Sequence, residues 1–257
     1  MYKVDLNADL GESFGVYTLG MDEQVMVHIT SANIACGWHA GDAMVMEKTV
    51  RAAAERGVAV GAHPGFPDLA GFGRRKLAVT PEEVRAYIQY QVGALWAFAR
   101  GAGVSLQHVK PHGALYNMSA ADMTLAVAVC EGIARVDEGL ILMGLAGSCH
   151  MEAARRVGIP VAGEVFADRG YRADGSLVPR GTPGAIITDE EEAVRRVIRM
   201  VKEGRVTAAD GTEVSVRADS VCLHGDNRHA VAFAARLRRE LEAADVEVEN
   251  LKSVLNG

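Results

Sequence analysis

The sequence predicts an α/β fold built on a parallel β-sheet. Short apolar segments of strand type alternate with longer segments of helical periodicity along the chain. Seven strand–helix units follow one another, and each helical crossover returns the chain to the same end of the sheet, which makes the strands parallel. This alternation fits either a closed barrel or an open doubly wound sheet. With 257 residues, of which 49% are hydrophobic, we expect a single domain over residues 1–257.

The expected strands are short runs rich in valine, leucine, isoleucine and alanine, as is typical of strands that are buried on both faces. Glycine and polar residues gather toward their ends. In chain order, the expected strands are residues 2–10, 32–37, 58–63, 106–113, 140–146, 160–168 and 219–226.

Segments of helical periodicity lie between these strands. The clearest start is TPEE at residues 80–83, which combines a capping threonine, a first-turn proline and first-turn acids. We expect long loops at residues 64–77 and 169–183, and a hairpin at residues 205–216 around its Asp-Gly pair. The expected helices are residues 22–30, 42–56, 80–100, 120–135, 150–157, 189–203 and 227–243.

Composition excludes several classes of protein. The net charge of −6 argues against nucleic acid or an anionic membrane as the main partner. No apolar run approaches the roughly 18 residues that a membrane span needs, and the first residues lack the apolar stretch of a signal peptide, so we expect a cytoplasmic protein. The four cysteines form no CxxC pair, and we expect reduced, mostly buried thiols. Neither GxGxxG after the first strand nor a P-loop is present.

The first strand has two faces of different character. Side chains alternate along a strand, so residues two apart share a face. Leu6, Ala8 and Leu10 form an apolar face, suited to packing on helices. Asp5, Asn7 and Asp9 form the opposite face, which is entirely polar. Because unpartnered buried carboxylates cost several kcal/mol, this face must meet cations, hydrogen-bond donors or a water-filled mouth.

Polar side chains also gather late in the other strands. The carboxyl ends of parallel strands are where the active sites of α/β proteins form, so these side chains are expected to face one pocket. Together with the first-strand residues, the candidate members are Asp5, Asn7, Asp9, His39, His63, Lys110, His112, Glu164, Asp168, His224 and Asp226.

Two arginines lie beside glycines in the long third loop, in the segment GFGRR at residues 71–75. Arg74 and Arg75 are suited to binding a carboxylate or a phosphate through paired hydrogen bonds. A solvated basic face is the alternative interpretation of either residue.

Six segments resemble the LamB/YcsF family: NADLGESFG, SANIACGWHAGD, GAHPGFPDLAGFGRR, VKPHGALYN, EVFADRGY and CLHGDN. They occur in order from about residue 5 to residue 230. The resemblance implies a seven-stranded parallel β/α barrel, TIM-like and of the glycoside hydrolase/deacetylase type. It also implies one subunit of an ATP-dependent 5-oxoprolinase, which opens 5-oxoproline (pyroglutamate) to L-glutamate while ATP becomes ADP and phosphate. The two partner subunits resemble the halves of an allophanate-hydrolase-like protein.

For that reaction we expect catalytic roles for Asp9, His39, His63, Lys110 and His112, with the base left open among the aspartate and the histidines. Hydrolysis needs a base for water and donors for developing negative charge, and phosphorylation of the amide oxygen would activate the lactam. The expected substrate-binding residues are Asp5, Asn7, Arg74, Glu164, Asp168, His224 and Asp226. ATP is the expected cofactor, but no motif locates its site.

An alternative interpretation is a stand-alone metal-dependent deacetylase or amidohydrolase that acts on a small amide or carbohydrate. Carboxylate and imidazole ligands from separate strands would hold a zinc-class ion. The candidate ligands are Asp5, Asp9, His39, His63 and His112. Because HExxH is not present, we expect no protein-bound catalytic metal. A third interpretation is a non-catalytic binding or regulatory subunit.

Overall fold

The computed structural model describes residues 2–223 and 228–256. Its strands are β1 (Tyr2–Leu10), β2 (Ser31–Ala35), β3 (Ala59–His63), β4 (Leu106–Val109), β5 (Ile141–Leu145), β6 (Val161–Phe166), β7 (Arg205–Thr207), β8 (Glu213–Ser215), β9 (Ser220–Leu223) and β10 (Val246–Val248). Its helices are α1 (Asp22–Val25), α2 (Ala43–Glu55), α3 (Pro81–Gly101), α4 (Gly113–Ala121), α5 (Met123–Ala134), α6 (Cys149–Val157), α7 (Glu190–Glu203), α8 (Arg228–Ala243) and α9 (Leu251–Asn256).

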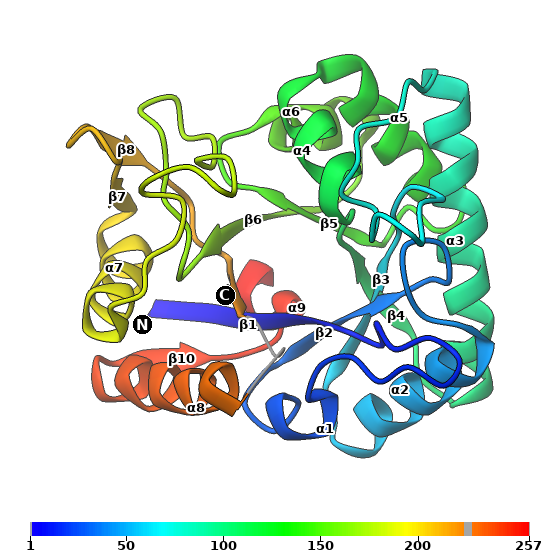
Figure 1. The fold of residues 1–257 in the computed structure, drawn as a ribbon, viewed down its shortest axis with the longest axis horizontal. Helices are drawn as coiled ribbons and strands as arrows, with labels where there is room; N and C mark the ends of the chain where they lie inside the picture. The colour runs from blue at the N-terminus through cyan, green and yellow to red at the C-terminus, as the bar shows by residue number, and fades with distance from the viewer. Residues whose placement is uncertain (1, 224–227, 257) are drawn as a thin grey trace.

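Seven parallel strands close into a barrel in the order β1-β2-β3-β4-β5-β6-β9. Closure occurs where β9 pairs with β1, in a register that runs from Asp5 opposite Ser220 to Ala8 opposite Leu223. Figure 1 shows the helices other than α9 arranged outside this ring of strands. The seven-stranded TIM-like barrel is therefore confirmed, and the open doubly wound sheet is wrong.

Two C-terminal elements that the sequence pattern did not predict complete one end of the barrel. Strand β10 pairs in parallel with the first residues of β1. Helix α9 follows and covers the amino ends of the strands, which we call the floor (Figure 1). Leu251 is fully buried there and packs with Ile141, Met143 and Ala162. The carboxyl ends of the strands, which we call the mouth, lie opposite.

Several element boundaries differ from the predicted ones. The expected helix 120–135 is two helices, because Asp122 caps α5 by accepting hydrogen bonds from the amides of Thr124 and Leu125. The expected strand 106–113 ends at Val109, since α4 begins at Gly113. The expected helix 22–30 contains only one helical turn, α1. The hairpin is confirmed as β7 and β8.

The two faces of β1 divide as predicted. Leu6, Ala8 and Leu10 belong to the hydrophobic core. The side chains of Asp5 and Asn7 are fully buried and hydrogen-bond to residues of neighbouring strands inside the barrel. The barrel interior beside β1 is therefore polar, and the buried groups of this face are hydrogen-bonded to neighbouring strands.

A β-bulge in β4 changes which side chains enter this interior. Val60 pairs with Leu106, whereas the next residue, Gly61, pairs with His108. The extra residue, Gln107, and His108 both reach interior partners as a result. Gly61 makes room for the His108 ring, because a methyl group there would overlap it.

Candidate active site at the barrel mouth

The lowest polar layer of the barrel is organised around Asp5. Its carboxylate accepts hydrogen bonds from Thr30 Oγ1 at 2.7 Å, from Ser31 Oγ at 2.6 Å and from Ser220 Oγ. Burial raises the pKa of Asp5 to about 6, although these hydroxyl donors offset part of the rise. Asn7 Nδ2 donates to Ser220 Oγ at 2.7 Å, which joins this layer to the one above it.

Lys110 lies at the centre of the next layer. Its ammonium group is 2.9 Å from Asp9 Oδ1 and 2.7 Å from Glu164 Oε1. It also donates to Asn7 Oδ1 and to Cys222 Sγ, each at 3.2 Å. Burial alone would lower the pKa of Lys110, but the neighbouring carboxylates outweigh it and hold this pKa well above 10.5. Lys110 is therefore a fixed positive charge, suited to stabilising an anion rather than to accepting a proton.

Asp9 connects Lys110 to the histidines of the mouth. While Oδ1 binds Lys110, Oδ2 lies 3.3 Å from His63 Nε2. Asn33 Nδ2 donates to Oδ1 at 2.9 Å. Burial raises the pKa of Asp9, but its interactions with His63 and Lys110 outweigh this effect and hold it well below 3.8. Asp9 is ionised at neutral pH.

Three histidines and one glutamate gather above Asp9: Glu12, His39, His63 and His112. One ligand atom of each lies within 4.8 Å of all the others. The rings of His39 and His112 stack with centroids 3.7 Å apart. Among the residues that the structure describes, this is the group whose spacing suits a metal ion. The expected ligands Asp5 and Asp9 lie outside it, and Glu12 takes part instead.

Glu12 was missed by the sequence reasoning. The strand alternation that identified Asp5, Asn7 and Asp9 stops at Leu10, because Gly11 turns the chain with a φ of +68°. The signal that could have found Glu12 is its position in the motif NADLGES, directly after β1.

Burial shifts the ionisation of this group. Burial and the neighbouring histidines hold the pKa of His39 well below 6.5, and the same causes lower the pKa of His112 to about 3. Burial, with the charge of Asp9, raises the pKa of Glu12 to about 7. The neutral imidazoles of His39 and His112 thus lie next to the carboxyl group of Glu12, which titrates near neutrality.

The loop after β3 covers the histidines. His112 Nε2 donates to the carbonyl oxygen of Phe72 at 2.9 Å. A side chain at Gly73, where φ is +61°, would press against His39 and His112. Arg75 and Asp68 form a paired hydrogen bond within this loop.

The two arginines of the loop differ in their surroundings. The Arg75 guanidinium forms an ion pair with Asp68, which is 4% exposed. The Arg74 guanidinium lies over the Phe72 ring, 5.0 Å from its centroid, and its charge acts on Glu12 and His112. Arg74 is thus the arginine that faces the histidines.

A cavity of about 360 Å³ opens beside the Lys110 layer, between the carboxyl ends of β6 and β9. Asp168 and Cys222 line it, and Phe233 contributes an aromatic wall. Because Cys222 Sγ also contacts Lys110 Nζ, the cavity borders the charged network. The expected residues His224 and Asp226 lie outside the described residues.

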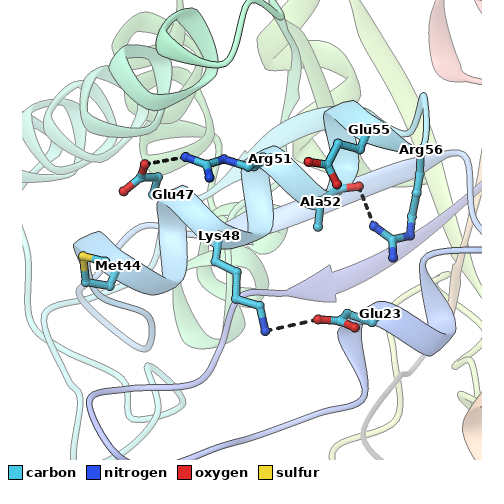
Figure 2. Close-up of a pocket in the computed structure, with 8 residues that line it drawn as sticks. All are labelled: Glu23, Met44, Glu47, Lys48, Arg51, Ala52, Glu55 and Arg56. Atoms are coloured by element: carbon cyan, nitrogen blue, oxygen red, sulfur yellow. Dashed lines mark hydrogen bonds and ion pairs between the residues drawn. The ribbon is translucent and has the colours of Figure 1, made fainter.

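A groove of about 380 Å³ lies on the outside of the barrel over α1 and α2 (Figure 2). Its charged side chains pair with one another: Lys48 with Glu23 at 3.1 Å and Arg51 with Glu47 at 2.8 Å. These are exposed ion pairs of small energetic value. We therefore locate the candidate site at the mouth and not in this groove.

The buried thiols are not set up as nucleophiles. Burial raises the pKa of Cys36 and of Cys130 to about 12 and that of Cys222 well above 9. The thiolate is the reactive form of cysteine. All four cysteines are free in the structure, in agreement with the prediction of reduced thiols.

Fold and site together define a parallel β/α-barrel protein with a cluster of buried charged and imidazole groups at the carboxyl ends of its strands. The profile of the LamB/YcsF family matches residues 4–256. The chain belongs to the LamB/YcsF family. The six motifs quoted from the sequence contain Asp9, Lys110 and Glu164 together with the glutamate and the three histidines of the mouth. Asp5 and Ser220, in the lowest layer, lie outside these motifs.

Known proteins resemble this chain over its whole length. A 5-oxoprolinase A subunit of Alkaliphilus metalliredigens is 58% identical over 99% of this chain and 100% of its own length. The 5-oxoprolinase A subunit of Bacillus subtilis is 55% identical, covering 96% of each chain. Among solved structures, a lactam utilization protein from Thermus thermophilus is 50% identical, with a TM-score of 0.91 over 96% of this chain and 99% of its own.

A more distant structure shares the fold alone. A putative cellobiose-phosphate cleavage protein from Enterococcus faecalis is 14% identical, with a TM-score of 0.61 over 98% of each chain.

No described helix combines the length and the apolar character that crossing a membrane requires.

Proposed function

We propose that this chain is the A subunit of an ATP-dependent 5-oxoprolinase and that its barrel mouth binds and hydrolyses the lactam of 5-oxoproline to give L-glutamate. The observation that carries the proposal is the 58% identity, over 99% of this chain and 100% of the relative, to a protein named as a 5-oxoprolinase A subunit. The similar Thermus structure carries the name of a lactam utilization protein, which supports the same class of substrate.

The mouth has the groups that lactam hydrolysis needs. Lys110 is a buried cation in contact with Cys222, which lines the cavity, and it would stabilise negative charge that develops on the lactam oxygen. The base that activates water is one of Asp9, His39, His63 and His112. Their acceptor atoms form one connected group, joined by Asp9 to Lys110.

The remaining candidates have supporting or substrate-binding roles. We assign the substrate carboxylate to Arg74, whose guanidinium faces the mouth, because an arginine binds a carboxylate through paired charged hydrogen bonds. Asp168 lines the cavity and would accept a hydrogen bond from the lactam nitrogen. Asn7 and Glu164 fix Lys110 in position by direct contact, and Asp5 supports Asn7 through Ser220.

We further propose that turnover requires two partner subunits, of the allophanate-hydrolase-like type, and ATP. The relatives are named as one subunit of an enzyme, which supports a multisubunit assembly. ATP cleavage to ADP and phosphate would drive the opening of an unactivated five-membered ring that closes again readily. The expected location of the complex is the cytoplasm.

Reconstitution tests the proposal. Glutamate release from 5-oxoproline and ATP is measured with this chain alone, with its two partners alone, and with all three. We expect release only from the complete mixture. Absence of release from a complex that is shown to be folded and assembled would contradict the assignment.

A variant pair tests the location of the site. In the assembled complex, Arg74→Gln is expected to lower kcat/KM for 5-oxoproline by about 10- to 100-fold, mainly through KM, because a charged hydrogen bond to the substrate is lost. Arg51→Gln, in the outer groove of Figure 2, is the matched control and should leave both constants unchanged. Equal kinetics in the two variants would remove Arg74 from the site.

The stand-alone metal-dependent amidohydrolase is the second candidate, and the grouping of Glu12 with three histidines favours it. It predicts hydrolysis of a small amide by this chain without ATP and without partners. The same reconstitution, run with this chain alone in the absence of ATP, separates the two functions.

A further inference from the structure

Four side chains converge at the mouth from four separate segments. Glu12 follows β1, His39 follows β2, His63 ends β3 and His112 precedes α4. The three histidine side chains are at most 6% exposed, and the Glu12 side chain is 17% exposed. Such a group, drawn from segments far apart in the sequence, is brought together by the pairing of the neighbouring strands β1, β2, β3 and β4.

Two backbone carbonyl groups fix which ring nitrogens carry hydrogen. His63 Nδ1 lies 2.7 Å from the carbonyl oxygen of Lys110, and His112 Nε2 lies 2.9 Å from that of Phe72. A carbonyl oxygen only accepts hydrogen bonds, so both of these nitrogens are donors. In each neutral ring the other nitrogen therefore carries a lone pair.

These two lone pairs point at each other. His63 Nε2 and His112 Nδ1 are 2.9 Å apart, and neither neutral ring has a hydrogen to donate across that gap. Glu12 Oε1 lies 3.7 Å from His112 Nδ1, and Asp9 Oδ2 lies 3.3 Å from His63 Nε2. Several electron-pair donors thus surround one point. A positive charge at that point is needed to offset the repulsion between them.

His39 extends this set of donors. Its Nε2 lies 3.3 Å from Glu12 Oε1, whereas its Nδ1 is buried without a hydrogen-bond partner among the described residues. No neighbour of Nδ1 therefore dictates which nitrogen carries the hydrogen, and Nε2 can present a lone pair. One proton bridges only one pair of atoms, whereas a divalent ion binds all four groups at once.

We propose that Glu12, His39, His63 and His112 bind a divalent transition-metal ion of the zinc class. Imidazole nitrogens with one carboxylate are typical ligands of such ions. The hydrogen bonds from His63 and His112 to backbone carbonyls are the outer contacts that orient metal-binding histidines. This site replaces the sequence-based expectation that the chain holds no metal, and its carboxylate ligand is Glu12 in place of the expected Asp5 and Asp9.

Metal binding is measured directly on the intact chain. After removal of metal with a chelator, the protein is titrated with Zn²⁺ by calorimetry and with Co²⁺ by visible absorption, which reports the coordination geometry. We expect one ion per chain and a rise in Tm on addition of Zn²⁺, because an ion that binds only the folded state stabilises it. Binding does not depend on lactam hydrolysis, so the failure of one proposal leaves the other standing.

Variants identify the ligands. His112→Gln and Glu12→Gln are each expected to weaken Zn²⁺ binding by about 100-fold or more, since even outer contacts of a metal site change affinity by about 10- to 100-fold. His28→Gln, a histidine outside the mouth, is the control and should bind as the wild type does. Melting curves recorded in the presence of chelator show whether each variant is folded. One folded variant is enough to test whether its residue is a ligand.

Two results would overturn the proposal. One is the absence of Zn²⁺ and Co²⁺ binding to the folded wild-type chain. The other is unchanged binding in both His112→Gln and Glu12→Gln, which would move the ion elsewhere. In the first case, nitrogen NMR of the rings would find a proton shared between His63 and His112.

Discussion

Asp5 is a buried acid whose ionisation opposes folding. Its pKa is about 6 in the folded protein and 3.8 in the ordinary case. Below about pH 4 both the folded and the unfolded states hold the proton; as the pH rises, the unfolded state releases it first, so stability falls until the pH passes about 6. The difference of about two pKa units corresponds to about 3 kcal/mol.

The variant Asp5→Asn is therefore expected to lose less stability with rising pH. Between about pH 4 and about pH 8, the free energy of unfolding of the wild type should fall by about 3 kcal/mol more than that of Asp5→Asn. Urea unfolding of both proteins at the two pH values measures this difference. Parallel pH profiles would show that the folded protein ionises Asp5 without cost.

At the scale of residues, strand alternation predicted which side chains come together at the candidate site. It identified the polar face of β1 and the inward series of Lys110 and His112, because side-chain alternation is a local property of a strand. It failed at Glu12, where the left-handed turn at Gly11 ends the alternation. It also could not tell Arg74 from Arg75, since the partner of Arg75 is Asp68, an earlier residue in an irregular loop.

At the scale of elements, the bulge in β4 depends on Gly61. An alanine there would place a methyl group in the ring of His108, which hydrogen-bonds to Asn33 at 2.8 Å. We expect Gly61→Ala to destabilise the protein by about 2 kcal/mol or more, because overfilling a packed interior forces side chains and backbone to shift. Chemical denaturation measures the change.

Gly93→Ala is the matched control for Gly61→Ala. Gly93 lies within α3 and has open space where a methyl group would be added. Alanine favours a helix over glycine by about 1 kcal/mol, so this variant is expected to be slightly more stable than the wild type. A loss of stability at both glycines would mean that the effect is not specific to the bulge.

Sequence reasoning predicted most elements but not this bulge. The helix that starts at TPEE was predicted within a residue or two, because its capping signals are local. The bulge arises from the register between β3 and β4, which are separated by the whole of α3. Helix α4 was missed for a related reason: its first residue, Gly113, closes a run that reads as a continuing strand.

At the scale of the whole molecule, α9 closes the floor. Leu251→Asp would place a carboxylate among Ile141, Met143 and Ala162. We expect it to destabilise the protein by at least about 3 kcal/mol, from lost apolar burial and from an unpaired buried charge. Thermal unfolding measures the loss, and the exposed neighbour provides the control: Lys252→Asp should change stability by less than about 0.5 kcal/mol. Equal effects would mean that the floor does not depend on Leu251.

The local sequence pattern did not predict that the barrel is closed. Alternating strands and helices fit an open or a closed sheet, and the choice depends on the pairing of β1 with β9, which lie near opposite ends of the chain. Only the resemblance to a family predicted the closed form. The floor was not predicted at all, because a short helix at the end of a chain has no distinctive periodicity.

The floor packs the amino end of the barrel with apolar side chains around Leu251. Buried polar side chains occupy the interior between Leu251 and the mouth. The cavity beside Cys222 lies at the opposite end, where β6 and β9 finish. A partner that covers this end of the barrel would therefore control departure from the cavity as well as entry, and the lifetime of the assembled complex would set an upper limit on how long a product is retained.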